Sequence, residues 1–410
     1  MKSLVYEPDF FDRSDSNFLN EMGRKIGITH KLKIRDIKDP VIQHDNYVKL
    51  KTRMCGICST DLSILGNKKD SDSANSAFSA ATKRSSHFLL GHEIVAEVVE
   101  IGPKVERVKI GDRVSIADDK NCDTFGLEAC DFCNAGLPLQ CTNKHKRKYL
   151  GNVGAGWCEY FVRHENQLFL IPEGMDDDVA VLTEPATVSL HSVLRLPPKE
   201  DDKVLVIGGG VIGLGIVSAL RALKVKSLAV TLLARYQFQK DKALELGADR
   251  VVGENDSYDA LSEILKTPLL GNKGNQVLNN GFNHIYDCVS SSSTINDSLR
   301  WLRPRGSLIL VGMDDRKNHI DFSLAVQREL SILGVHGYAH NSFEGKSQHT
   351  LSRCIDWMNI GRYNVKSLLT HKYPPQKHRE ALKIATSHHS KNNMLAEKLK
   401  PIKVAFDFSS

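Results

Sequence analysis

The chain has 410 residues, of which 41% are hydrophobic and 25% are charged, and its formal net charge is +6. This length exceeds one ordinary hydrophobic core, so we expect a globular protein of two domains. So small a net charge gives no support for a nucleic-acid partner, because basic residues must be concentrated on one surface to attract polyanions.

The chain lacks membrane and export signals. No apolar run reaches the roughly 18 residues of a membrane span, and the first residues lack the apolar core of a secretion signal. Nine cysteines in such a chain indicate a reducing compartment and metal thiolates rather than disulfides. We therefore predict a cytoplasmic protein with no membrane partner.

A C-x-x-C pair, Cys55 and Cys58, follows a segment at 47–51 whose alternating apolar and polar residues predict a half-buried strand. Such a pair can bind zinc through both sulfurs, form a redox couple, or supply one ligand beside a second thiol. A redox pair usually opens a helix in a thioredoxin-like unit, which this context does not indicate. We favour Cys58 as one metal ligand, with Cys55 packed behind it.

An imidazole and a carboxylate follow in the segment Gly91-His92-Glu93. Thiolate, imidazole and carboxylate are the groups from which proteins build zinc sites, and three protein ligands with an open fourth position define a catalytic zinc. Residues 67–86, just before this segment, are rich in Ser, Ala, Asn and Lys without periodicity. That composition predicts a long mobile insertion.

Four further cysteines predict a second, structural zinc site. They are Cys122, Cys130, Cys133 and Cys141. Four thiolates close a tetrahedral structural site, and the spacing of the last three is typical of a zinc lobe. The seven residues between Cys122 and Cys130 are an unusually wide gap, so a reduced cysteine cluster without metal is the alternative.

Glu184 stands in an otherwise apolar, helix-like stretch, residues 180–193. A carboxylate in such surroundings needs a partner. A metal ion or a metal-bound water would supply one.

From about residue 200 the pattern changes to that of a dinucleotide-binding unit. The apolar run 203–207 predicts a strand buried on both faces of a parallel sheet. It is followed by G-x-G-x-x-G and a helical pattern, 214–223, so that glycines and a helix N-terminus can receive a pyrophosphate. The candidate cofactor-binding residues are Gly208, Gly210, Val211, Ile212 and Gly213.

The end of the second strand of this unit, 227–235, bears on the choice of cofactor. An acid there would bind the ribose hydroxyls of NAD, but the strand ends in Arg235, which could meet the 2′-phosphate of NADP. NADP is therefore favoured over NAD, and a solvated strand end is the alternative. Further α/β units are predicted at 249–252, 282–289 and 306–312.

These motifs, in this order, resemble the zinc-dependent medium-chain dehydrogenase/reductase family of alcohol, sorbitol, threonine and glucose dehydrogenases. The matching segments are 56–61, 91–93, 111–114, Glu184-Pro185 with His191, 208–213 and 245–249. The resemblance implies an α/β fold in which a GroES-like, β-rich catalytic domain (1–190 and 335–410) carries an inserted Rossmann domain with a doubly wound parallel sheet (191–334).

The resemblance also implies roles for single residues. The implied ligands of the catalytic zinc are Cys58, His92 and either Glu93 or Glu184. Thr60 matches the hydroxyl that passes the substrate proton to solvent, and Asp61 matches the acid that orients the histidine ligand. The implied reaction is reversible hydride transfer between NAD(P) and a small alcohol, such as a polyol, sugar or secondary alcohol, or its carbonyl product. Relatives are dimers or tetramers, so a homodimer or homotetramer is expected.

The sequence departs from the family pattern in the zinc lobe, where Leu127 stands at the place of the first structural cysteine and Cys122 substitutes for it after an insertion. Ala96 also replaces a glycine that usually follows the Gly-His-Glu motif. Two alternative functions are compatible with the sequence. One is a zinc-free, NADPH-dependent reductase of activated C=C bonds, against which Cys58, His92 and Glu184 argue. The other is a non-catalytic dinucleotide-binding sensor or scaffold.

Overall fold

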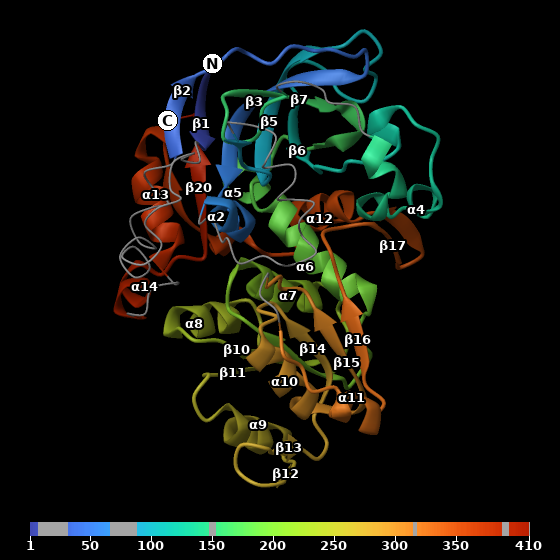
Figure 1. Ribbon diagram of the computed structural model, residues 1–410, viewed down its shortest axis with the longest axis vertical. Helices are drawn as coiled ribbons and strands as arrows, with labels where there is room; N and C mark the ends of the chain where they lie inside the picture. Colours follow the sequence, from blue (N-terminus) through green and yellow to red (C-terminus); the bar gives the residue numbers. More distant parts are fainter. Residues whose placement is uncertain (7–31, 66–87, 147–152, 315–317, 388–392, 410) are drawn as a thin grey trace, which may run out of the picture. The chain divides into compact units, whose positions relative to one another are not determined.

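The computed structural model describes residues 1–6, 32–65, 88–146, 153–314, 318–387 and 393–409, and the chain forms two compact units (Figure 1). One unit comprises Met1–Glu184 with Leu369–Ser410, and the other comprises Pro185–Leu368. The resemblance implies domain boundaries after residues 190 and 334, and the two compact units divide after residues 184 and 368. The predicted insertion at 67–86 lies outside the described residues. None of the described helices is long and apolar enough to cross a membrane.

The first unit is built around a seven-stranded sheet of order β19-β20-β3-β5-β6-β8, with β7 paired to β3. Its strands are β3 (Tyr47–Gly56), β5 (Ile94–Ile101), β6 (Arg113–Ile116), β7 (Tyr160–His164), β8 (Leu168–Leu170), β19 (Leu369–Tyr373) and β20 (Lys403–Asp407). A second sheet, β2-β1-β4, contains β1 (Lys2–Tyr6), β2 (Leu32–Asp36) and β4 (Phe88–Leu89). The C-terminal strand β20 pairs antiparallel with β3, which sets Phe406 opposite Cys55 and brings the end of the chain beside the C-x-x-C segment.

Short helices connect the strands of this unit. They are α2 (Ser59–Leu65), η1 (Asp123–Phe125), α4 (Asp131–Asn134), η2 (Pro138–Gln140), η3 (Thr142–Lys146), η4 (Glu165–Gln167), α5 (Asp177–Ala180), η6 (Pro375–Lys377), α13 (His378–Ala385) and α14 (Asn393–Leu399). Helix α6 (Thr183–Arg195) begins where the two units divide.

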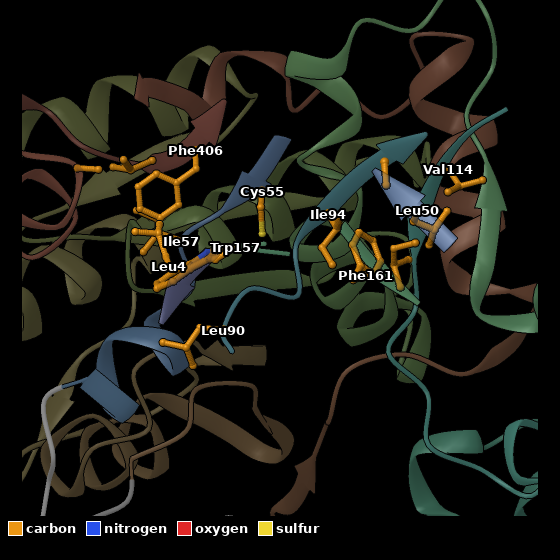
Figure 2. Packing of buried hydrophobic residues seen from close by; sticks show 14 of the residues in the cluster. Leu4, Leu50, Cys55, Ile57, Leu90, Ile94, Val114, Trp157, Phe161 and Phe406 are labelled. Atoms are coloured by element: carbon orange, nitrogen blue, oxygen red, sulfur yellow. The ribbon is translucent and has the colours of Figure 1, made fainter. Parts of the chain in front are cut away.

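The core of the first unit includes Cys55 and Ile57 of the C-x-x-C segment (Figure 2). Trp157 is completely buried and its ring meets that of Phe406 edge to face, with centroids 5.2 Å apart. Cys55 is also completely buried in this cluster. Cys55 is therefore a core residue, and burial raises the pKa of its thiol well above its usual range.

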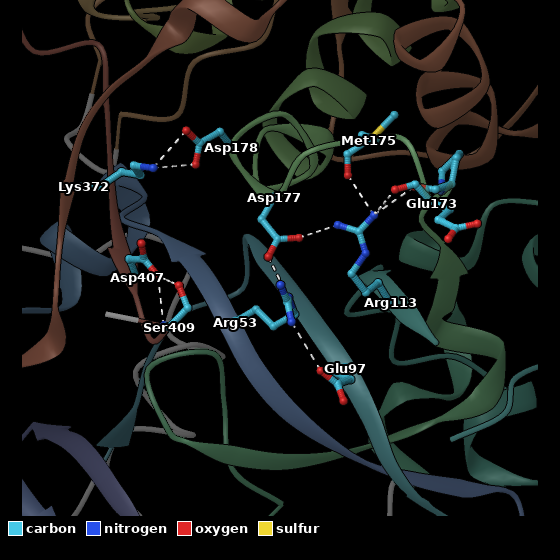
Figure 3. Close-up of polar contacts among 11 residues, drawn as sticks. Arg53, Glu97, Arg113, Glu173, Met175, Asp177, Asp178, Lys372, Asp407 and Ser409 are labelled. Atoms are coloured by element: carbon cyan, nitrogen blue, oxygen red, sulfur yellow. Dashed lines mark hydrogen bonds and ion pairs between the residues drawn. The ribbon is translucent and has the colours of Figure 1, made fainter. Parts of the chain in front are cut away.

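Arg113, from the Gly-Asp-Arg-Val motif, clamps the turn that precedes α5 (Figure 3). Its guanidinium pairs with Asp177 at 2.6 Å and donates to three carbonyl oxygens of the 172–175 turn at 2.8–3.0 Å. The other oxygen of Asp177 accepts from Arg53 of β3 at 2.6 Å. This turn leads through α5 to the start of α6. Arg113 of β6 and Arg53 of β3 therefore hold the segment that precedes Glu184 against the sheet.

The second unit has a parallel sheet of six strands, order β11-β10-β9-β14-β15-β16. These strands are β9 (Lys203–Ile207), β10 (Ala229–Leu233), β11 (Arg250–Val252), β14 (Phe282–Asp287), β15 (Leu302–Leu310) and β16 (Ser331–Gly334). The chain winds outward from β9 in both directions, which is the doubly wound order of a Rossmann fold. The predicted parallel sheet is confirmed.

The remaining elements of the second unit are helices and two hairpins. The helices are α7 (Val211–Ala222), α8 (Gln237–Glu245), α9 (Ser257–Leu265), α10 (Ser292–Trp301), α11 (Ser323–Gln327), α12 (Thr350–Asn359) and η5 (Lys366–Leu368). One hairpin joins β12 (Leu269–Leu270) to β13 (Val277–Leu278), and the other joins β17 (His340–Phe343) to β18 (Lys346–His349).

Candidate active site and metal centres

Cys58 lies in the tight connection between β3 and α2. The strand ends at Gly56, the backbone N–H of Ile57 donates to Val404 O of β20 at 2.9 Å, and the helix begins at Ser59. Thr60 therefore falls in the first turn of α2, with its hydroxyl oxygen 3.7 Å from Cys58 Sγ. The thiol and this hydroxyl thus lie next to each other.

The Gly91-His92-Glu93 segment enters β5 from a position that only glycine fits well. Gly91 has φ +94°, and a Cβ on it would lie 2.4 Å from the Trp157 ring and 2.8 Å from Cys55 Sγ. Such a positive φ is strained for any other residue. The close approach sets His92 and Glu93 beside the end of β3, where Gly56 N donates to Glu93 O at 2.8 Å.

These two segments bring three potential metal ligands together. Cys58 Sγ, a ring nitrogen of His92 and a carboxylate oxygen of Glu93 all lie within 4.8 Å of one another. One zinc ion with bonds of about 2.0–2.3 Å could contact a sulfur, a nitrogen and an oxygen spaced in this way. The residues therefore fit the group that the sequence indicates.

Asp61 connects the two segments that carry these ligands. Its carboxylate is buried and accepts from the backbone N–H of Cys58 at 3.0 Å and of Gly91 at 3.3 Å. Its Oδ1 also lies 3.6 Å from His92 Nδ1. Burial disfavours the charged imidazole, but Asp61 and Cys58 together outweigh it and raise the pKa of His92 well above its usual range.

Glu93 forms an ion pair with Lys403, a residue that belongs to none of the sequence motifs. The Lys403 ammonium lies 2.6 and 2.7 Å from the two carboxylate oxygens, and both side chains are at most 3% exposed. Lys403 is the only charged residue in the apolar run Ile402–Phe406, which is the signal that could have found it. A buried lysine needs a charged partner nearby.

Glu184 does not belong to either group of potential metal ligands among the described residues. It lies in the first turn of α6 and is half-buried. Burial raises the pKa of its carboxyl to about 7, with a contribution from Glu93, while His92 and Lys403 oppose the rise. The charges of His92 and Glu93 therefore influence the pKa of Glu184, although Glu184 is not one of the three grouped ligands.

The four lobe cysteines also come together, with all four sulfurs within 4.8 Å of one another. The wide gap after Cys122 is taken up by η1 and by Gly126 at φ +62°, and Leu127 N then donates back to Cys122 O at 2.8 Å. This turn returns the chain to Cys122, whose sulfur accepts from the backbone N–H of Cys130 at 3.4 Å. Four converging thiols fit a tetrahedral zinc ion.

The glycine-rich segment forms the predicted strand–turn–helix between β9 and α7. Gly208 has φ +105°, and a Cβ on Gly213 would lie 1.9 Å from Gly208 O. Gly210 is the N-cap of α7, and nothing lies within 4 Å of the place of its missing Cβ. Val211 and Ile212 open the helix. The open space at Gly210 and the free N–H groups of the first turn fit a pyrophosphate.

Arg235 follows β10 and is half-exposed. Its Nε pairs with Glu254 at 3.0 Å. An exposed ion pair of this kind is weak, so the guanidinium can exchange Glu254 for another anion.

Comparison with known proteins identifies the family of the chain. Residues 44–173 match the model of the alcohol dehydrogenase GroES-like domain, and residues 211–352 match that of the zinc-binding dehydrogenases. D-arabinitol dehydrogenase 1 of Uromyces fabae is 27% identical over 84% of this chain and 87% of its own length. Sorbitol dehydrogenase of Bacillus subtilis strain 168 is 25% identical over 87% of this chain and 91% of its own.

A solved structure shares the fold. An alcohol dehydrogenase of Escherichia coli CFT073 (rspB), in complex with NADH, matches 100% of this chain and 99% of its own with a TM-score of 0.73 and 22% identity. The fold and the two family models thus define a two-unit oxidoreductase whose second unit has a doubly wound parallel sheet. The chain belongs to the zinc-type medium-chain dehydrogenase family, which confirms the resemblance and argues against a scaffold or a zinc-free reductase.

Proposed function

We propose that the protein oxidises a polyol or a similar small secondary alcohol with a nicotinamide cofactor, and reduces the corresponding carbonyl, at the group formed by Cys58, His92 and Glu93. The observation that carries the proposal is the convergence of a thiol, an imidazole and a carboxylate within 4.8 Å, in a unit that matches the alcohol dehydrogenase GroES-like domain. The sorbitol and arabinitol dehydrogenases among the relatives support a polyol.

Each residue of the proposed site has a separate role. A bound zinc ion supplies a Lewis acid that lowers the pKa of the substrate hydroxyl. Cys58, His92 and Glu93 hold that ion, and Asp61 fixes the imidazole and both backbone segments. The Thr60 hydroxyl borders the thiol at 3.7 Å and takes over the proton that the alcohol releases.

Glu93 is proposed as the third ligand in preference to Glu184. It shares the 4.8 Å group with the sulfur and the imidazole, and Glu184 does not. Replacement of each by Gln tests the choice: we expect Glu93→Gln to lose zinc on dialysis and Glu184→Gln to keep it. The reverse result would assign the role to Glu184.

The cofactor is proposed to be NADP. Supporting this choice, β10 ends in Leu233-Ala234-Arg235, with no acid to bind a ribose 2′-hydroxyl. Arg235→Ala should raise the KM for NADP about tenfold and leave that for NAD unchanged, since one charge-assisted hydrogen bond contributes about 1.5–3 kcal/mol. Equal effects on both cofactors would remove this argument.

We also propose a structural zinc at the four lobe cysteines, a cytoplasmic location, and a homodimer or homotetramer. All nine cysteines are free, which suits a reducing compartment. The edge strand β16 leaves Ile332 37% exposed, and Val326 of α11 is 79% exposed. Edge strands with apolar neighbours favour pairing with a second chain, and light scattering of the purified protein would give the number of chains.

The decisive experiment is a metal analysis combined with a substrate panel. The purified protein should contain zinc, and polyols and secondary alcohols should reduce NAD or NADP as followed by the absorbance of the reduced nicotinamide. Activity that survives complete removal of the metal would reject the proposal.

A further inference from the structure

The ion pair between Lys403 and Glu93 is the most deeply buried one in the described part of the chain, with the two side chains 3% and 2% exposed. Burying both charges is expensive and is offset only when the geometry is good and every hydrogen bond is made. Here the lysine comes from β20 at the C-terminal end, and the glutamate immediately follows His92. The pair therefore links the last strand directly to a candidate metal ligand.

The surroundings leave the Glu93 carboxylate little freedom. An ammonium group has three N–H donors, and those of Lys403 face Glu93 Oε1, Glu93 Oε2 and Ile57 O, at 2.6, 2.7 and 3.1 Å. On another side lies Gly56, where a Cβ would come within 1.9 Å of Glu93 Oε2. With both oxygens bonded and Oε2 packed against Gly56, the carboxylate cannot rotate without breaking a buried hydrogen bond.

We propose that Lys403 is a positioning residue of the metal site, which fixes the plane of the Glu93 carboxylate so that it faces Cys58 and His92. The inference deepens the proposed function and rests on it. Lys403 touches neither substrate nor cofactor in this role; it acts only through Glu93. Partners that orient a metal ligand typically change metal affinity or activity by about 10–100-fold when removed.

Removing Lys403 has two opposite effects on the affinity of the site for its metal ion. Loss of orientation weakens metal binding, because the carboxylate is free to turn away. Loss of a positive charge beside the site strengthens metal binding, because one repulsion with the dication disappears. Since ligand geometry decides how well a fixed site grips its ion, we expect orientation to dominate.

The experiment measures how fast Zn²⁺ passes from the full-length protein to an excess of a chromogenic chelator. Lys403→Met keeps the length of the side chain and removes its donors and charge, so zinc should leave about 10–100 times faster than from the wild type. Lys403→Arg keeps charge and donors and should restore the rate to within about threefold. An unchanged or slower release from Lys403→Met would overturn the proposal.

Lys372→Met is the matched control. Lys372 lies on the neighbouring strand β19, opposite Ala405 of β20, and binds both oxygens of Asp178 at 2.8 and 2.9 Å. That pair is exposed on both sides, at 43% and 42%. Its loss should leave zinc release unchanged; if Lys372→Met accelerated release as much as Lys403→Met, the effect would be one of general stability and the proposal would fail.

A second readout separates geometry from folding. In the protein reconstituted with Co²⁺, the visible absorption reports the coordination of the ion, so Lys403→Met should alter its intensity and Lys372→Met should not. If Lys403→Met does not fold, Lys403→Gln takes its place, with the same acceleration expected because one amide cannot bind both oxygens and Ile57 O. Failure of the proposed function would show as a wild type without metal or activity; failure of this inference leaves the wild type loaded and active, with variants that match it.

Discussion

Asp61 Oδ1 lies 3.6 Å from His92 Nδ1, and the same carboxylate accepts backbone N–H groups from both segments that carry the candidate ligands. Asp61 is therefore both the partner of the imidazole and the connection between the C-x-x-C turn and the Gly-His-Glu segment. A carboxylate in contact with a ligating histidine fixes the orientation and tautomer of its ring.

Replacement of Asp61 by Asn should lower zinc retention and kcat/KM by about 10–100-fold. The amide has one acceptor oxygen, so it cannot serve both backbone N–H groups and the imidazole. Asp112→Asn is the control, because Asp112 Oδ2 accepts Lys109 N at 2.8 Å in an exposed turn. Zinc content after dialysis and kcat/KM measure the effect; equal values for the two variants would contradict the role given to Asp61.

Replacement of Gly56 by Ala should disturb the same site through a clash with Glu93. The new Cβ would lie 1.9 Å from Glu93 Oε2, so the carboxylate and Lys403 must both shift. Overpacking of this kind costs about 1–3 kcal/mol of stability, and zinc should be lost more easily. Gly174→Ala is the control, since nothing lies within 4 Å of its added Cβ. Denaturant titration with zinc analysis tests it, and a Gly56→Ala protein as stable and metal-rich as the control would refute the packing argument.

Replacement of Cys122 by Ser tests the second metal centre. Structural zinc sites use four protein ligands, so the loss of one thiolate should lower the content from about two zinc ions per chain to about one. Cys288→Ser should keep both ions, because Cys288 lies at the end of β14 and outside both ligand groups. Atomic emission analysis of the purified variants measures the ratio; two ions retained in Cys122→Ser would mean that this cysteine is no ligand.

Local patterns predicted the parallel sheet and the turn at Gly208 because the residues that define them are consecutive. The pairing of Glu93 with Lys403 spans 310 positions, so only the fold reveals it. The wide gap after Cys122 was ambiguous for a related reason: the helical turn and the positive φ of Gly126 that absorb it leave only a weak trace in the sequence. Alternation and spacing describe an element well, but they do not say which distant side chain it meets.

Side-chain contacts within the second unit are also invisible to local patterns. From about residue 340 the sequence pattern is mixed, and in the structure β17, β18 and α12 group with the second unit. Arg353 of α12 is 3% exposed and donates to carbonyl oxygens of both strands of this hairpin, Asn341 O at 3.2 Å among them. Contacts of one buried arginine with backbone carbonyls leave no periodic pattern in the sequence, so they cannot be predicted from it.

Acid should destabilise the protein through buried histidines, and His164 offers the clearest case. Its Nδ1 accepts Asn166 N at 3.2 Å, which caps η4 and requires an unprotonated nitrogen. Burial lowers the pKa of His164, although Asp123 and Glu165 oppose the shift. The ordinary pKa of a histidine in an unfolded chain is about 6.5. As the pH falls through this value, the unfolded chain takes up a proton more readily than the folded state. The contribution of His164 to the free energy of unfolding is therefore fully present above this pH and is lost as the pH decreases.

Burial also lowers the pKa of His191, His284, His371 and His378, which adds to the effect. The raised pKa of Glu184, about 7, acts in the opposite direction in the metal-free protein, because a buried acid that keeps its proton favours the folded state at low pH. A variant at one histidine is therefore needed to isolate the contribution of His164 from the sum.

His164→Asn and His164→Ala form a matched pair for this test. Asparagine is a good N-cap without a titrating proton, so His164→Asn should keep the stability of the wild type at pH 7.5 and lose less of it at pH 5.5. His164→Ala loses the cap at every pH and should be less stable throughout by about 1 kcal/mol. Urea unfolding at both pH values measures the difference. A His164→Asn protein whose loss between pH 7.5 and 5.5 equals that of the wild type would show that protonation of His164 does not contribute to acid unfolding.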